Sequence, residues 1–125
     1  MTALVHDASA SDPRTWDELE VELTEVFRLT QQAVLAGEPV VYVVHEPSLW
    51  GHSGPLRSAL ATALLGGMRT LALEQARNGL PVNAVAASDE VTAEQVQLCV
   101  DFLVSSGLSG QVITCGRTHL GRPAA

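Results

Sequence analysis

The sequence predicts an α/β domain in which about four parallel strands alternate with helices. Two observations lead to this fold class. The segment 39–45, PVVYVVH, is an almost uninterrupted β-branched run, which is typical of a strand covered on both faces of a parallel sheet. Other apolar runs alternate with longer segments whose apolar residues recur at helical spacing. The resulting order, β-α-β-α-β-α-β, implies right-handed crossovers and helices on both faces of the sheet.

The first predicted strand is the short apolar run 3–6, which is followed by a loop of small and polar residues at 9–14. Thr15 then begins a helix, because Thr15 and Glu18 have the spacing of a capping box. Apolar residues recur through this helix at helical spacing, and Gly37 ends it.

The strand at 39–45 is followed by a loop at 46–54 and by a second helix, which begins at Pro55 and ends before Gly79. No residue between 59 and 68 is charged, so this helix is expected to be buried nearly all round. A domain of this size can hardly surround such a helix alone. Part of the helix surface is therefore expected to meet another chain.

The rest of the chain completes a single domain, 1–125. Its predicted elements are a strand at 80–86, a turn at 88–91, a helix opened by a capping box at Thr92 and Gln95, a loop at 105–110, a strand at 111–115 and a tail at 117–125.

Composition excludes several classes of function. The formal net charge of −7 argues against nucleic-acid binding. No apolar run is long enough to span a membrane, and the N-terminus does not have the pattern of a signal peptide.

The two cysteines, Cys99 and Cys115, are expected to be core thiols of a cytoplasmic protein. Acidic residues gather between positions 17 and 25, which indicates a solvated face or a surface for a basic partner.

The segment 66–86, GGMRTLALEQARNGLPVNAVA, resembles the matching segment of the short-chain dehydrogenase/reductase family, particularly its 3-oxoacyl-carrier-protein reductases. The segments 3–9, 40–45 and 110–113 also resemble that family. The resemblance implies a truncated, catalytically degenerate member that keeps the second half of the fold, a partial Rossmann-like sheet. The family's glycine-rich phosphate turn lies in the other half, and no G-x-G-x-x-G occurs here, so no cofactor is expected.

The resemblance also implies that the family's catalytic residues are replaced. The asparagine maps to Glu22, and the serine maps to His45 or the residue beside it. The tyrosine maps to Arg57 and the lysine to Ala61. The chain contains no lysine, and its only tyrosine is Tyr42. Since the family mechanism needs a tyrosine hydroxyl acidified by an ammonium group, oxidoreductase activity is not expected.

The features that the family uses for assembly are better preserved. In these enzymes the helices that resemble 16–35 and 55–77 pack against their twofold mates. The strand at 3–6 would also lie at an uncovered sheet edge. We therefore predict a non-catalytic subunit that oligomerises with itself or with a full-length reductase of this family. The predicted interface consists of Phe27, Leu56, Leu60, Ala63, Leu64, Gly67 and Leu71.

Two alternatives remain open. The first is a repurposed isomerase, cyclase or lyase acting on an acyl or polyketide-like substrate at the carboxyl edge of the sheet. His45 beside a carboxylate would be its base, and Arg57 would hold an anion. Asp7, Glu22, Glu46 and His52 are further candidates for that site. The second alternative is a small-molecule binding module. No metal is expected, because metal-like His or Cys spacing is absent from the sequence.

Overall fold

The computed structural model describes residues 2–116, and the predicted tail at 117–125 lies outside the described residues. Four parallel strands form one sheet in the order β1-β2-β3-β4. The elements are β1 (Leu4–Asp7), α1 (Trp16–Leu35), β2 (Val40–His45), α2 (Glu46–Leu49), α3 (Pro55–Gln75), the 3-10 turn η1 (Ala76–Asn78), β3 (Val82–Ala87), α4 (Ala93–Ser105) and β4 (Val112–Cys115). The predicted fold class is thus confirmed, and β1 lies at a sheet edge as expected.

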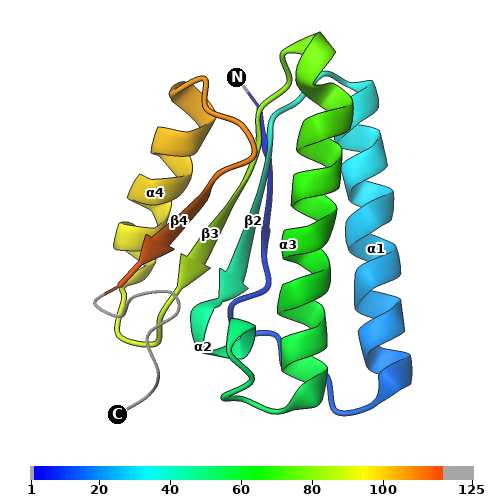
Figure 1. Ribbon diagram of the computed structural model, residues 1–125, viewed down its shortest axis with the longest axis vertical. Helices are drawn as coiled ribbons and strands as arrows, with labels where there is room; N and C mark the ends of the chain where they lie inside the picture. Colours follow the sequence, from blue (N-terminus) through cyan, green and yellow to red (C-terminus); the bar gives the residue numbers. More distant parts are fainter. Residues whose placement is uncertain (1, 117–125) are drawn as a thin grey trace.

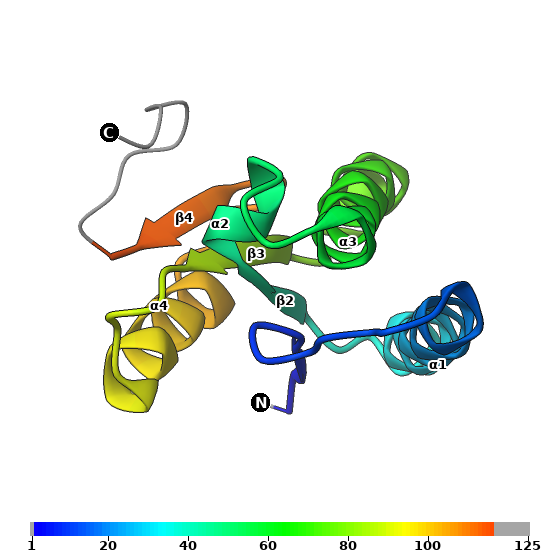
Figure 2. The same cartoon turned by 90° about the horizontal axis from the view of Figure 1, so that it is seen from below.

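The sheet lies between two layers of helices, which are seen end-on in Figure 2. Helices α1 and α3 cover one face, where Val26, Leu64 and Met68 pack on the even-numbered residues of β2 and β3. Helix α4 covers the other face through Val100 and Leu103 (Figure 1). The sheet continues in one direction from β1 to β4, but α4 lies opposite α1 and α3. The three crossovers therefore cannot all be right-handed, and the last has the hand opposite to the first two.

Local capping signals set the helix ends. The Thr15 hydroxyl accepts a hydrogen bond from the amide of Glu18 at 3.1 Å, which caps α1. Thr92 and Gln95 form the full reciprocal capping box at the start of α4. Gly79 has φ 66°, the left-handed conformation that ends the turn after α3. The segment 46–54, which was expected to be a loop, contains the short helix α2.

Helix α3 is not buried all round, so that expectation was wrong. Leu60 and Leu64 are 2% and 0% exposed because their spacing of four residues aims both at the sheet. These two residues belong to the chain's own core, and their predicted place in an oligomer interface is also wrong. The opposite side of α3, with Gly66 and Leu73, is exposed. The absence of charge between 59 and 68 thus reflects one core face and one outward face of small and apolar residues.

Candidate functional site

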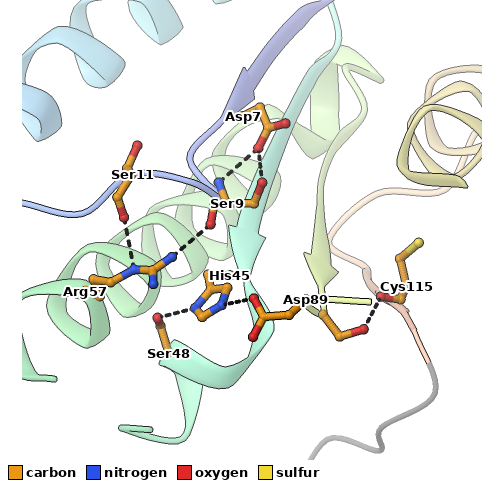
Figure 3. A network of polar contacts seen from close by, with 9 residues as sticks. Asp7, Ser9, Ser11, His45, Ser48, Arg57, Asp89 and Cys115 are labelled. Atoms are coloured by element: carbon orange, nitrogen blue, oxygen red, sulfur yellow. Dashed lines mark hydrogen bonds and ion pairs between the residues drawn. The ribbon is translucent and has the colours of Figure 1, made fainter. Parts of the chain in front are cut away.

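The carboxyl edge of the sheet brings two loops together through His45 (Figure 3). His45 is the last residue of β2 and pairs in register with Ala87, the last residue of β3. The His45 ring is nearly buried. Its Nε2 lies 2.7 Å from Oδ1 of Asp89, and its Nδ1 lies 2.7 Å from Oγ of Ser48. The imidazole thus connects the start of α2 with the loop that leads to α4.

This Ser48–His45–Asp89 row does not have the geometry of a nucleophilic triad. Ser48 is 0% exposed, so its hydroxyl cannot meet a substrate from solution. Both ring nitrogens of His45 already have protein partners, and a general base needs one nitrogen within hydrogen-bond reach of the substrate. The Asp89 side chain is 78% exposed, so only movement of Asp89 would free Nε2.

Arg57 holds the loop that follows β1. Its Nε donates to the carbonyl of Ser11 at 3.1 Å, and its Nη2 donates to the carbonyl of Ser9 at 3.0 Å. The space that Arg57 shares with His45 and Ser48 is too small to admit a water molecule. These contacts favour a structural role for Arg57 over the binding of an anion.

Asp7 and His45 meet at an open groove on the α4 face of the sheet. The groove has a volume of about 450 Å³ and also exposes the Asp89 carboxylate. Oδ1 of Asp7 accepts hydrogen bonds from the amide and the hydroxyl of Ser9, at 2.9 and 2.6 Å. Asp7 therefore stabilises the turn after β1 and presents negative charge at one end of the groove.

The other predicted site residues lie elsewhere. Glu22 faces His6 between α1 and β1, with 3.7 Å between Oε2 and Nε2, and within the described residues neither atom has a hydrogen-bond partner. Glu22 lines neither the groove nor the space behind His45. Glu46 is buried and accepts a hydrogen bond from Nε1 of Trp50 at 3.0 Å, and His52 is exposed. The structure thus brings Asp7 and His45 together, with Arg57 behind the ring, but not Glu22.

Sequence reasoning missed Ser48 and Asp89. The signal that could have found Asp89 is its position just after β3, the strand that neighbours β2. Because parallel strands end at one edge of a sheet, a carboxylate after β3 is a natural neighbour of the last residue of β2.

Ala61 and Tyr42 are both buried side chains of the core. Ala61 is 3% exposed and packs in the core. Tyr42 is 1% exposed, and its hydroxyl lies 2.6 Å from Oγ1 of Thr30. Burial raises the pKa of Tyr42 above its usual value, and the hydrogen bond with Thr30 only partly opposes that rise. The Tyr42 hydroxyl is therefore not placed to donate a proton to a substrate.

The outward surface of α1 and α3 carries a second hollow, which we call the α1–α3 groove. It has a volume of about 490 Å³ and is lined by Phe27, Thr30, Gln31, Val34, Leu35, Tyr42, Gly66, Gly67, Thr70, Leu71, Glu74 and Gln75. Phe27 is 43% exposed, and Leu35 and Leu73 are 82% and 81% exposed. Among the other predicted interface residues, Leu56, Ala63, Gly67 and Leu71 are half-buried.

The two thiols lie next to each other where β4 ends, at the same carboxyl edge of the sheet. Cys115 is buried at the end of β4, and Cys99 is half-buried on α4. Burial raises the pKa of Cys115 to about 11, with a further contribution from the neighbouring Cys99 thiol. Neither cysteine forms a disulfide.

Residues 2–116 contain neither a membrane-spanning helix nor a cluster of metal ligands. None of the helices there combines the length and apolar character that a membrane crossing requires. In the same residues, no three His, Cys, Asp or Glu side chains gather in a way that could hold a metal ion.

Two solved enzyme structures share this fold, which agrees with the Rossmann-like sheet that the sequence predicts. The enoyl-[acyl-carrier-protein] reductase (NADH) of Aquifex aeolicus VF5 superposes with a TM-score of 0.72 at 17% identity, covering 92% of this chain and 60% of the reductase. The acetoin dehydrogenase YohF of Salmonella typhimurium superposes with a TM-score of 0.71 at 19% identity. The match covers 92% of this chain and 63% of the dehydrogenase. The chain thus spans about three fifths of the length of these two structures. No protein-family model and no curated protein sequence matches it.

Proposed function

We propose that this chain is a non-catalytic subunit of reductase fold that oligomerises through the outward faces of α1 and α3. Its partner is a second copy or a full-length reductase of the same fold, which it stabilises or modulates. One observation carries this proposal. The α1–α3 groove and the exposed side chains of Phe27, Leu35 and Leu73 form an apolar face on two helices that have no further layer over them within the described residues.

The energetics of this face favour association. Burial of apolar surface contributes roughly 25 cal/mol per Å². Leu35 and Leu73 are each more than four fifths exposed, so covering them removes nearly two whole leucine side chains from water. Leu35 lines the α1–α3 groove together with Gly66 and Gly67. In twofold pairing each copy would present this same apolar patch to the other.

The side chains at the positions that resemble the family's catalytic residues support a non-catalytic role. Arg57 is engaged by two backbone carbonyls, and Ala61 lies in the core. The only tyrosine is buried, and the sequence contains no lysine. A cytoplasmic location, where thiols stay reduced, suits the two unpaired cysteines.

A pair of matched variants tests the interface. Leu73→Glu places a charge on the α1–α3 face, where Leu73 is 81% exposed. Leu98→Glu makes the same change on α4, where Leu98 is 70% exposed. Because both leucines are exposed, neither change should unfold the chain. In light scattering, Leu73→Glu should lower the mass of the complex to that of a monomer, while Leu98→Glu should leave it unchanged. Equal masses for both variants and the unaltered chain would reject the α1–α3 interface.

The same measurement separates the two partners. A second copy gives a homodimer with the purified chain alone. If the chain alone is a monomer, it should form a complex with a full-length reductase of this fold co-expressed from the same host. Separate elution of the two proteins at every salt concentration would exclude that partner.

A second candidate function is a repurposed isomerase, cyclase or lyase with an acyl or polyketide-like substrate. The observation that favours it is the placement of the His45–Asp89 pair beside an open groove of about 450 Å³. Asp89 would have to release Nε2 so that His45 could act as a base. β-Ketoacyl thioesters incubated with the chain and analysed by mass spectrometry provide the test. Turnover lost in His45→Ala but kept in Leu98→Glu supports this function, and no turnover by the unaltered chain rejects it.

A further inference from the structure

The sequence contains two cysteines, and the fold brings both thiols to one place. Cys115 is the last residue of β4, and Cys99 lies on α4, the helix that precedes this strand. Both residues line the same pocket, which has a volume of about 600 Å³ at the carboxyl edge of the sheet. The Cys99 thiol is also close enough to contribute to the pKa of Cys115. Two side chains that can be oxidised to one disulfide are therefore neighbours between helix and sheet.

Ordinary strand and helix geometry places these two side chains on facing surfaces. Side chains alternate along a strand, so Cys115 lies on the α4 face of the sheet together with Ile113. On α4, Cys99 belongs to the stripe that faces the sheet, between Val96 and Leu103. Among the described residues β4 pairs only with β3, so the end of this strand is freer to move than a central strand. This freedom favours the Cα–Cα separation of about 4.4–6.8 Å that a disulfide requires.

The two thiols differ in exposure. Cys115 is 7% exposed, whereas Cys99 is half-buried and lines the pocket. Burial, together with Cys99 and Glu90, raises the pKa of Cys115 to about 11. At about pH 8, only about one molecule in a thousand then carries the Cys115 thiolate. Because the thiolate is the reactive form, Cys99 meets an oxidant first and Cys115 reacts second.

We propose that Cys99 and Cys115 are a redox-active pair that closes to an intrachain disulfide by exchange with a small-molecule disulfide. In the first step the Cys99 thiolate attacks the small disulfide, which forms a mixed disulfide and releases one thiolate. In the second step the Cys115 thiol loses its proton to solvent, and its sulfur attacks Sγ of Cys99 and releases the second thiolate. The two cysteines give up two electrons and two protons, and the small disulfide is reduced to two thiols. Since both cysteines belong to one chain, the reaction does not depend on the proposed oligomer interface.

The first step prepares the second. Once Cys99 is part of a mixed disulfide, it is no longer a neighbouring thiol that raises the pKa of Cys115, and burial and Glu90 are the remaining causes. The mixed disulfide is also held beside Cys115, so the second attack is intramolecular. The mixed disulfide should therefore not accumulate. Disulfides in reducing compartments are mostly transient, which agrees with the unpaired thiols of the structure.

Equilibration of the purified full chain with glutathione tests the proposal. The chain is held at about pH 8 in mixtures of reduced glutathione and glutathione disulfide, quenched with acid and analysed by intact-mass spectrometry. The oxidised chain should be lighter by two hydrogen atoms, and the oxidised fraction should depend on the square of the reduced glutathione concentration. Dithiothreitol should restore the original mass. A stable glutathione adduct, a disulfide-linked pair of chains or an unchanged mass would each overturn the proposal.

Two alanine variants establish the order of attack. Cys115→Ala should stop at a mixed disulfide between Cys99 and one glutathione, because no second thiol remains. Cys99→Ala should gain glutathione at least about tenfold more slowly than Cys115→Ala, since its only thiol is buried and largely protonated. Circular dichroism checks that both variants are folded. Equal rates in the two variants would contradict the assignment of Cys115 as the second thiol.

Thermal unfolding tests whether the disulfide fits the native fold. The bond joins α4 to β4 and closes the loop between them, so the unfolding midpoint of the oxidised chain should lie about 5–10 °C above that of the reduced chain. Cys115→Ala treated with the same glutathione mixtures is the control and should show no such rise. A lower midpoint in the oxidised chain would show that the bond distorts the fold, and would overturn the proposal.

Discussion

Nε2 of His45 lies 2.7 Å from Oδ1 of Asp89, so a buried ring at the end of β2 is tied to an exposed carboxylate after β3. With Ser48 on the other ring nitrogen, this contact gives His45 a structural role between two loops. His45→Ala should lower the free energy of unfolding in urea by about 1–3 kcal/mol, because Ser48 Oγ is left buried without the ring. Asp89→Ala should cost less than about 1 kcal/mol, since Asp89 is mostly exposed. A loss for Asp89→Ala as large as for His45→Ala would contradict this account.

Arg57 should stabilise the fold by holding the loop that follows β1. Arg57→Ala removes two charge-assisted hydrogen bonds to the carbonyls of Ser9 and Ser11, and should lower the unfolding free energy by about 1–3 kcal/mol. The loop should also open, so trypsin should cleave faster after Arg14, which is exposed. Arg69→Ala, at an exposed position on α3, is the matched control and should change neither quantity. Unchanged stability and an unchanged cleavage rate in Arg57→Ala would show that Arg57 does not hold this loop in place.

Gly66→Ala should separate folding from association. A methyl group at Gly66 meets no atom within 4 Å, so replacing a glycine inside α3 should stabilise the monomer by about 0.5–1 kcal/mol. If Gly66 lies in a close helix–helix interface, the same methyl group should raise the dissociation constant of the oligomer by about tenfold. Urea denaturation in the monomeric Leu73→Glu background measures the first effect, and sedimentation velocity in the wild-type background measures the second.

Gly67→Ala should affect the stability of the monomer differently from Gly66→Ala. The added methyl group would lie 3.2 Å from Cε1 of Phe27, so the ring must shift and the gain in helix stability should be partly lost. Tighter association in Gly66→Ala would show that this part of α3 does not approach another helix.

The raised pKa of Cys115 should make the free energy of unfolding fall at alkaline pH. Its pKa in the folded chain is raised from 9.0 to about 11, chiefly by burial. Below pH 9 the thiol is protonated in both the folded and the unfolded state, so the stability that its burial contributes does not depend on pH there. As the pH rises from 9 to 11 the unfolded thiol ionises first, and that contribution is lost. Urea midpoints should therefore fall more steeply over this range in the unaltered chain than in Cys115→Ala. Parallel pH profiles for the two proteins would be inconsistent with the raised pKa.

Local features of the structure were predictable from the sequence, whereas contacts between distant segments were not. Thr92 and Gln95 lie three residues apart, and their capping box needs no tertiary structure. The β-branched run of β2 likewise identifies a strand buried on both faces. The contact between His45 and Asp89 joins residues 44 positions apart and depends on the register of β2 with β3.

The errors on α3 have the same origin. From the sequence alone, a small or apolar residue that faces the chain's own sheet cannot be distinguished from one that faces another molecule. Leu64 therefore could not be distinguished from Leu73 until the rotation of α3 over the sheet was known.

Native mass spectrometry of the complex purified from its own host measures whether the chain is part of an oligomer. We expect an assembly of at least twice the monomer mass of 13.2 kDa, containing either two copies or one copy with a full-length reductase. That assembly should be lost in Leu73→Glu and retained in Leu98→Glu. A monomer of 13.2 kDa at the concentration found in the cell would contradict the account.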